Sequence, residues 1–211
     1  MKLPALADLR VGVIVLGYVG LPLAAYLSRH FAVIGFLRDC NFYIVTVPKP
    51  VENAKRPDLS ALLRASRGVG QVLSPATSLS MSPPRFQALL RKSAFRSWKR
   101  SPVSNSIRIF AGYSPERINP GDLAHRVPDI IKVTSGSTPE VGDLVDSVYA
   151  TVITAGTHRA NSIRVAEAAK VIENIRERFC RSRRPSASRR AGCPRCGHTL
   201  HPRGARLAAN L

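Results

Sequence analysis

The chain has 211 residues, enough for one ordinary domain with a real core, and its 45% apolar content is globular rather than disordered. No apolar run is long enough to cross a bilayer, and the four cysteines do not make a disulfide framework, so we expect no membrane span and a cytoplasmic location. The net charge of +19 suggests a nucleic-acid binder, but residues 76–110 and 176–211 contribute +7 and +9 of it. The rest of the chain is nearly neutral.

The first part of the chain has the order strand, turn, helix, strand, which opens a βαβ unit. A buried strand is predicted over 11–16, a turn over 17–20, a helix over 21–30 and a second strand over 31–36. The β-branched and aromatic run at 41–47 predicts a third strand, which Pro48 stops.

The middle of the chain changes character. A helix is predicted over 58–73, with Asp58 as its N-cap. Residues 76–110 are rich in serine, arginine and proline and show neither a strand nor a helix period, so we expect them not to pack into the core.

The pattern returns after residue 110. Strands are predicted at 130–134 and 150–154, and a helix over 160–175. Between the two strands, Thr138 is a candidate N-cap of a helix with one apolar stripe formed by Val141, Leu144, Val145 and Val148. From Arg176 the composition of arginine, serine, proline and glycine predicts a disordered basic tail.

These elements predict an α/β fold, namely an incomplete Rossmann-like parallel sheet with a long C-terminal helix and a disordered basic tail. We expect one sheet-bearing domain over 1–155, in which 76–110 is an aberrant segment. Residues 156–175 would begin a central inter-domain helix, and 176–211 would form the tail.

The turn after the first strand reads Val15-Leu16-Gly17-Tyr18-Val19-Gly20, where a G-x-G-x-x-G fingerprint would stand. Glycines at such a turn let the pyrophosphate of a dinucleotide approach the backbone and the following helix N-terminus. Here Val15 replaces the first glycine. By itself, this broken fingerprint is equally compatible with a tight strand–helix turn that binds no ligand.

Six longer strings follow one another along the chain: GYVGLPLA at 17–24, DCNFYIVTVPKP at 39–50, KRPDLSALLRAS at 55–66, GYSPERINPGD at 112–122, KVTSGSTPEV at 132–141 and ITAGTHRANSIRVAEAAKVIEN at 153–174. Together they resemble the UDP-glucose/GDP-mannose dehydrogenase family. The most similar branch oxidises UDP-N-acetylhexosamines to uronic acids for surface polysaccharides. Domain 1–155 is then expected to be a remnant NAD-binding domain.

The resemblance implies a double NAD-dependent oxidation of a UDP-sugar alcohol to a carboxylate, through a thioester on a cysteine. It implies that Glu116 lies beside the sugar and helps the water step, and that Lys170 and Asn174 stabilise the oxyanion from one helix face. From spacing alone, the favoured interpretation of these three is a turn carboxylate and two solvated helix residues. The implied NAD-binding residues are Gly17, Tyr18, Val19 and Gly20, and no metal site is implied. Family members form homo-oligomers.

Departures from the family pattern predict that this copy is inactive and binds NAD weakly or not at all. After Phe36 the family continues with an acidic residue that holds the adenosine ribose, then a further helix and strand; here Leu37 follows and the chain passes to the strand at 41–47. The glycine-rich segment with the nucleophilic cysteine is absent, since none of the four cysteines lies in such a segment.

A slip of the reading frame explains residues 76–110. Family members carry here a stretch of the type GD-V-x-Y-EST-V-YPG-ATEE. Codons for ATSLSMSPPRFQALLRKSAFRSWK can be chosen so that, read one nucleotide out of register, they give GDVAVYESTAFPGATEEECVPVLE. We interpret the segment as a frame slip near Pro75 that is restored near Phe110. The same origin for the tail is only a hypothesis.

The tail offers an alternative from another class. Its arginines could grip phosphates, which would make the chain a non-enzymatic basic protein that binds polyanions or nucleic acid. Only Phe179 could stack on a base, so an evolved nucleic-acid role is not expected. The set Cys193, Cys196, His198 and His201 resembles zinc ligands, but it is crowded into nine residues with arginine-rich flanks, and no zinc site is expected.

Overall fold

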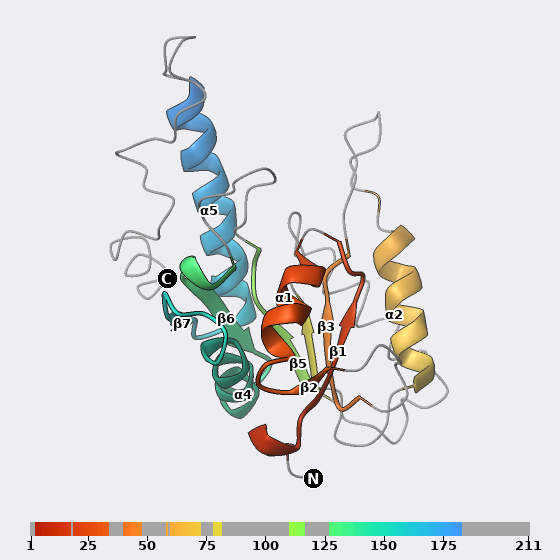
Figure 1. The fold of residues 1–211 in the computed structure, drawn as a ribbon. Helices are drawn as coiled ribbons and strands as arrows, with labels where there is room; N and C mark the ends of the chain where they lie inside the picture. The colour runs from red at the N-terminus through yellow and green to blue at the C-terminus, as the bar shows by residue number, and fades with distance from the viewer. Residues whose placement is uncertain are drawn as a thin grey trace.

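The computed structural model describes residues 3–17, 19–33, 40–47, 58, 60–72, 78–81, 110–116 and 127–182. Within these ranges one sheet is flanked by helices (Figure 1). Its strands are β1 (Arg10–Ile14), β2 (Ala32–Val33), β3 (Phe42–Val45), β4 (Ser78–Met81), β5 (Phe110–Tyr113), β6 (Lys132–Gly136) and β7 (Thr157–Arg159). The α-helices are α1 (Gly20–Leu27), α2 (Ser60–Val72), α4 (Pro139–Ala150) and α5 (Ile163–Ser182), and single 3-10 turns lie at Leu6–Asp8 and Val127–Asp129.

The strand order is β2-β1-β3-β4-β5-β6-β7, and the first five strands are parallel. A dinucleotide-binding sheet has the order 3-2-1-4-5-6. This sheet has the same order, but within the described residues no strand lies outside β2. Only eight residues, 34–41, join β2 to β3, whereas a helical crossover needs about a dozen or more. The prediction of an incomplete Rossmann-like sheet is therefore confirmed.

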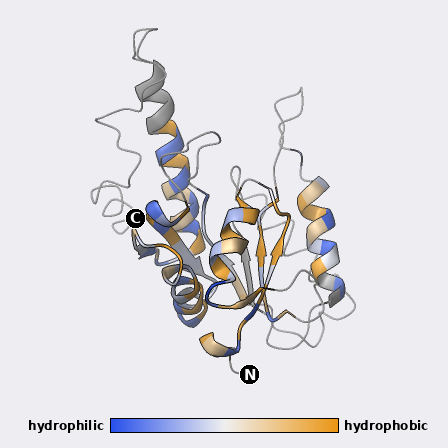
Figure 2. Cartoon of the chain, viewed as in Figure 1, coloured by the Kyte–Doolittle hydropathy of each residue, from blue (hydrophilic) through white to orange (hydrophobic). Residues whose placement is uncertain are grey.

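The core lies on both faces of β3. Phe42 and Ile44 face one way and Tyr43 and Val45 the other, and none of the four is more than 1% exposed. The first pair packs with side chains of α1 and α4, and the second with side chains of α2 and α5. A strand buried on both faces needs an unbroken apolar run, which is why 41–47 gave such a clear strand signal. Figure 2 shows the apolar strands between the amphipathic helices.

One predicted strand is wrong. Residues 150–154 were expected to be extended, but α4 continues to Ala150 and the chain then turns. Val152 and Ile153 are 5% and 3% exposed, so this apolar run packs a turn against the core instead of forming a strand. The strand that follows is β7, which pairs in parallel with β6.

The expectation that nothing in 76–110 enters the core is also wrong, because β4 lies inside the sheet. It pairs in parallel with β3 and β5, from Phe42↔Ser78 to Met81↔Tyr113. The four-residue alternation Ser-Leu-Ser-Met is too short to register as a period in a longer window. A strand there satisfies backbone groups that the strands on both sides would otherwise leave unpaired. Trp98 and the rest of 82–109 lie outside the described residues.

The long C-terminal helix begins at Ile163 and continues past Arg176, where the sequence predicts the tail to begin, to end at Ser182. Residues 183–211 lie outside the described part of the chain, and so does the cysteine–histidine set. Among the described helices, none combines the length and the apolar composition that a bilayer crossing requires.

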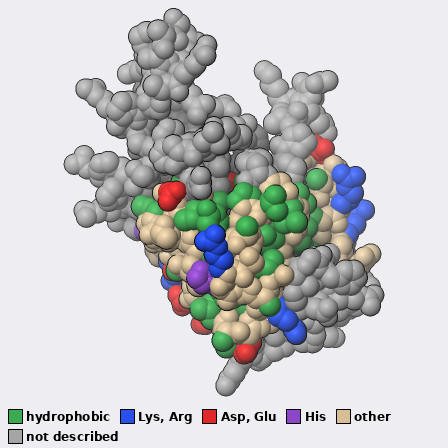
Figure 3. All heavy atoms as spheres, in the orientation of Figure 1, with side chains coloured by type: hydrophobic (Ala, Val, Ile, Leu, Met, Phe, Trp, Pro, Cys, Tyr) green, Lys and Arg blue, Asp and Glu red, His purple; other side chains and the backbone are tan. Residues whose placement is uncertain are grey.

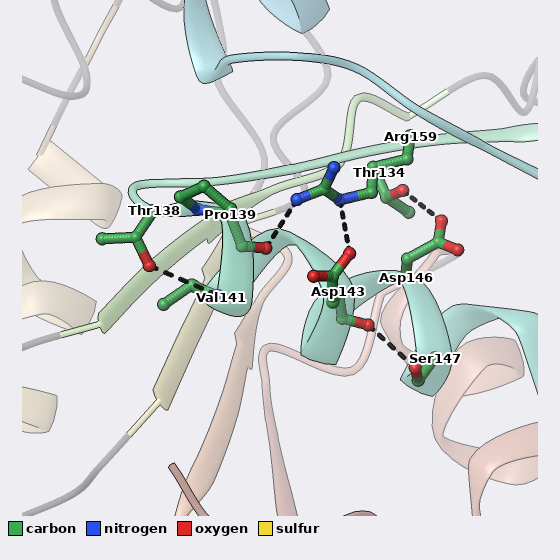
Figure 4. A network of polar contacts seen from close by, with 8 residues as sticks. All are labelled: Thr134, Thr138, Pro139, Val141, Asp143, Asp146, Ser147 and Arg159. Carbon is green, nitrogen blue, oxygen red and sulfur yellow. Dashed lines mark hydrogen bonds and ion pairs between the residues drawn. The ribbon is translucent and has the colours of Figure 1, made fainter. Parts of the chain in front are cut away.

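Helix α4 is held against β6 and β7 by polar contacts of its first two turns and of Asp146 (Figure 4). Arg159 of β7 donates to the Pro139 carbonyl at 2.6 Å and pairs with Asp143 at 2.9 Å. The Thr134 hydroxyl of β6 donates to the Asp146 carboxylate at 2.5 Å. These contacts join α4 to both strands at this end of the sheet.

The predicted N-caps are confirmed. The Asp58 carboxylate accepts from the Ser60 amide at 2.8 Å, and hydrogen bonds from Ser60 lower the pKa of Asp58. At α4, the Thr138 hydroxyl accepts from the Val141 amide at 3.4 Å. A hydrogen bond to Thr138 also lowers the pKa of Glu140.

Replacing Thr138 with alanine is expected to lower the free energy of unfolding by about 1 kcal/mol, because the cap bond to the Val141 amide is lost. Thr138→Ser keeps the hydroxyl and is expected to behave like the parent chain. Urea denaturation of the three proteins measures the difference. Equal stability of the alanine and serine variants would show that the cap contributes nothing.

Candidate functional site

After β1 the chain passes through α1 to β2, which pairs with β1 on one side. The next strand, β3, pairs with β1 on the other side. In open α/β sheets, ligands bind at such a switch point, outside the carboxyl ends of the strands. The two strands end together there, because Ile14 of β1 lies opposite Val45 of β3. The predicted turn at Gly17–Gly20 therefore lies at the switch point.

The three glycine positions of the fingerprint have three different environments. At the first, Val15 adopts φ 72°, the left-handed conformation that a β-branched residue rarely tolerates. At the second, a Cβ on Gly17 would find nothing within 4 Å. At the third, a Cβ on Gly20 would lie 2.1 Å from the Val15 carbonyl oxygen. A tight turn, an open backbone and a close helix–strand approach are the uses of these three positions in dinucleotide-binding turns.

The N-terminus of α1 is open to a ligand. Val19 occupies the N-cap position, and no side chain in the described part of the chain caps this helix. Backbone N–H groups at such an end are a ready site for a phosphate. Of the predicted cofactor residues, Gly17, Val19 and Gly20 are brought together here, and Tyr18 lies outside the described residues.

Apolar side chains border this turn. Val15, Leu16 and Leu21 are 40%, 57% and 57% exposed, and Figure 3 shows apolar side chains gathered on this face of the molecule. Ligand sites are mostly apolar with a few placed polar groups. A ligand that combines a phosphate with flat apolar parts suits this surface.

The side chain of Thr46 lies against the turn, although no feature of the sequence indicated this. It follows β3, its side chain is buried, and its hydroxyl lies 2.6 Å from the Val15 carbonyl. A Cβ on Gly20 would lie 2.5 Å from the same hydroxyl. Thr46 therefore touches both ends of the turn.

A second polar cluster lies after β5. The Glu116 carboxylate pairs with Lys132 Nζ at 3.1 Å, and the two side chains are only 3% and 5% exposed. The ammonium group also lies 5.7 Å from the centre of the Tyr149 ring. Charges this deeply buried are tolerated only when they are paired. Sequence reasoning found Glu116 but missed Lys132, which looks like an ordinary residue at the start of a strand.

Tyr113 connects this cluster to α5. Its hydroxyl has no hydrogen-bond partner among the described residues. Burial raises the pKa of Tyr113 well above its usual value, and the negative charges of Glu167 and Glu116 raise it further. Tyr113 also packs in one core cluster with Ile163 and Ala166, so the end of β5 lies against the first turns of α5.

The two predicted catalytic residues of α5 lie just beyond this point. Lys170 is one turn after Glu167, is 9% exposed, and pairs with Glu173 at 3.3 Å. Asn174 is half-buried one turn later. Glu116 thus forms an ion pair with Lys132, and Lys170 forms one with Glu173.

Tyr113 should make the protein sensitive to alkaline pH. An unfolded tyrosine ionises near pH 10, while the buried one keeps its proton to higher pH, so stability is full below about pH 10 and falls as the pH rises toward the raised value. Tyr113→Phe should flatten this fall. Denaturant unfolding at pH 8, 10 and 11 measures the slopes, and identical slopes would contradict the assignment.

The strand order and the turn are those of the dinucleotide-binding class of α/β folds. Solved structures share the fold: the chain matches an NDP-N-acetyl-D-galactosaminuronic acid dehydrogenase from Methanosarcina mazei Go1 with a TM-score of 0.66 at 18% identity, over 82% of this chain and 48% of that one. It matches the UDP-N-acetyl-mannosamine dehydrogenase Cap5O of Staphylococcus aureus with a TM-score of 0.64 at 17% identity, over 82% of this chain and 55% of that one. No protein-family profile matches the chain.

Sequence relatives are more specific. The chain is 42% identical to UDP-N-acetyl-D-glucosamine 6-dehydrogenase of Pseudomonas aeruginosa, over 79% of this chain and 49% of that protein. It is 36% identical to Protein CapL of Staphylococcus aureus, over 78% of this chain and 48% of that protein. The chain belongs to the nucleotide-sugar dehydrogenase family, and it spans about half the length of the curated relatives it matches.

The alignment also measures what is missing inside the matched part. It runs over 207 positions, whereas 79% of 211 residues is about 167, so the Pseudomonas aeruginosa relative has about 40 residues that this chain lacks. The short connection 34–41 stands where a full sheet has a helix and the outermost strand.

Proposed function

We propose that the described residues are the dinucleotide-binding half of an NAD-dependent dehydrogenase acting on a UDP-N-acetylhexosamine. The observation that carries the proposal is the turn at the switch point, with its open Gly17 and its close approach at Gly20. The relatives named UDP-N-acetyl-D-glucosamine 6-dehydrogenase supply the substrate class. A cytoplasmic location, expected from the few and unevenly placed cysteines, is part of the same proposal.

The NAD pyrophosphate would lie over Gly17 and the uncapped N-terminus of α1. NAD, when bound, accepts the hydride from the sugar alcohol. This copy should hold NAD weakly, because Val15 strains the turn and the sequence has no acidic residue where the family holds the adenosine ribose. Loss of such contacts lowers affinity by about tenfold for each 1.4 kcal/mol.

For the chemistry on the sugar, the resemblance assigns Glu116 to the water step and Lys170 and Asn174 to the oxyanion. Tyr113 stands three residues before Glu116 and packs with Ile163 and Ala166 of α5, which supports this grouping. We propose that the 211-residue chain does not complete the double oxidation, since none of its cysteines stands in the segment where the family has its nucleophile. Without a thioester the second oxidation has no route.

The test is an NAD titration of the parent chain and of Val15→Gly, by calorimetry. Glycine removes the strain at φ 72°, so the variant is expected to bind NAD about tenfold more tightly or more. Affinity that is equal in both chains, or absent from both, would overturn the cofactor site. Binding that is weakened steeply by salt and is shared with tripolyphosphate would favour the polyanion-binding alternative.

A further inference from the structure

We propose that Thr46 is a positioning residue that holds the dinucleotide-binding turn in shape from the neighbouring strand. The proposal rests on the proposed function for the identity of the ligand, but the contacts that carry it belong to the turn itself.

Thr46 stands one residue beyond the paired part of β3. Its amide donates to the Ile14 carbonyl at 3.0 Å, which continues the ladder between β1 and β3 by one more bond. Its side chain then reaches past the end of β1. The hydroxyl lies 2.6 Å from the Val15 carbonyl and 3.0 Å from the Ile14 carbonyl. A hydroxyl has one proton to donate, and the shorter distance favours Val15.

This bond holds the peptide that follows the strained residue Val15. A β-branched residue at φ 72° is strained and persists only where its surroundings fix it. Among the described hydrogen bonds, the one to the Val15 carbonyl comes from Thr46. Fixing that carbonyl also fixes the plane of the following peptide and hence the path of the chain into Gly17.

The same bond also determines where the first residue of α1 can lie. The Val15 oxygen and the Thr46 hydroxyl are the two groups that a Cβ at Gly20 would strike, at 2.1 and 2.5 Å. The first residue of α1 therefore rests on the bonded pair. Thr46 thus links β3, the strained residue and the helix N-terminus at which a phosphate would bind.

The variants that test this are Thr46→Val, which removes only the hydroxyl, and Thr46→Ser, which keeps it. The matched control is Thr151→Val, because the Thr151 hydroxyl also donates to a backbone carbonyl, that of Val148 at 2.8 Å, but at the far end of α4. All are made in the full chain. Amide chemical shifts and hydrogen exchange at Leu16, Gly17 and Gly20 report the shape of the turn.

We expect Thr46→Val to shift these amides and to speed their exchange by about tenfold, with little change in Thr46→Ser or Thr151→Val. Unchanged turn amides in Thr46→Val would overturn the proposal. So would a change of the same size in the Thr151→Val control.

A second measurement separates this inference from the cofactor assignment. In the Val15→Gly background, adding Thr46→Val is expected to weaken NAD binding about tenfold more than adding Thr151→Val. If NAD binds none of these variants, the proposed function fails, and the turn amides alone decide whether Thr46 holds the turn. If NAD binds equally with and without the Thr46 hydroxyl, Thr46 has no positioning role.

Discussion

Gly20→Ala is expected to destabilise the protein by about 3 kcal/mol, because the added methyl group fits only if α1 moves away from the turn. Its Cβ would lie 2.1 Å from the Val15 oxygen and 2.5 Å from the Thr46 hydroxyl, and those two groups are bonded to each other. Leu23 and Leu27 bury the same helix in the core, at 1% and 0% exposure. The helix therefore has little freedom to retreat. Guanidinium unfolding measures the loss.

Gly17→Ala is the matched control for this prediction. Its methyl would meet nothing within 4 Å, so stability should stay within about 0.5 kcal/mol of the parent chain. In the Val15→Gly background, however, the same methyl should abolish NAD binding, because it fills the space over which the pyrophosphate passes. If Gly20→Ala is as stable as Gly17→Ala, the close approach at the third glycine position is not a constraint.

Much of the fold could be predicted from the sequence, because its signals are local. The apolar run at 41–47 predicted a strand buried on both faces, and the structure leaves none of Phe42–Val45 more than 1% exposed. Thr138 and the stripe from Val141 to Val148 predicted both the start and the buried face of α4. Caps and stripes depend on neighbours within two turns, so the sequence alone carries them.

The strand β4 was missed because its pairing partners lie far away in the sequence. It pairs with β3 and β5, and a short stretch of sequence around Ser78 contains neither of them. The run at 150–154 was predicted to be a strand because its residues are apolar. They are apolar because the turn they form is buried, and not because the chain is extended there.

The site shows the same division. The fingerprint located Gly17 and Gly20, since their spacing is local. Thr46 and Lys132 were missed, because each matters only through a residue of another strand or loop. In the second case the partner is Glu116, 16 positions away.

Lys132→Met is expected to lower the free energy of unfolding by about 3–5 kcal/mol, because it removes the buried cation that pairs with the buried Glu116 carboxylate. Methionine keeps most of the side-chain volume, so the loss reports the missing charge more than a cavity. The exposed pair of Arg159 and Asp143, whose side chains are 36% and 65% exposed, is the matched control. Asp143→Asn, which removes only this charge pair, should cost about 1 kcal/mol or less, as exposed ion pairs contribute little.

The double variant Lys132→Met/Glu116→Met separates the charge from the packing. With both charges removed, most of the stability should return, since replacing a buried pair with apolar groups is often neutral. A single variant that does not fold beside a double variant that does would give the same answer. If the double variant is no more stable than Lys132→Met alone, the buried carboxylate is not what destabilises the single variant, and Glu116 is held by contacts other than Lys132.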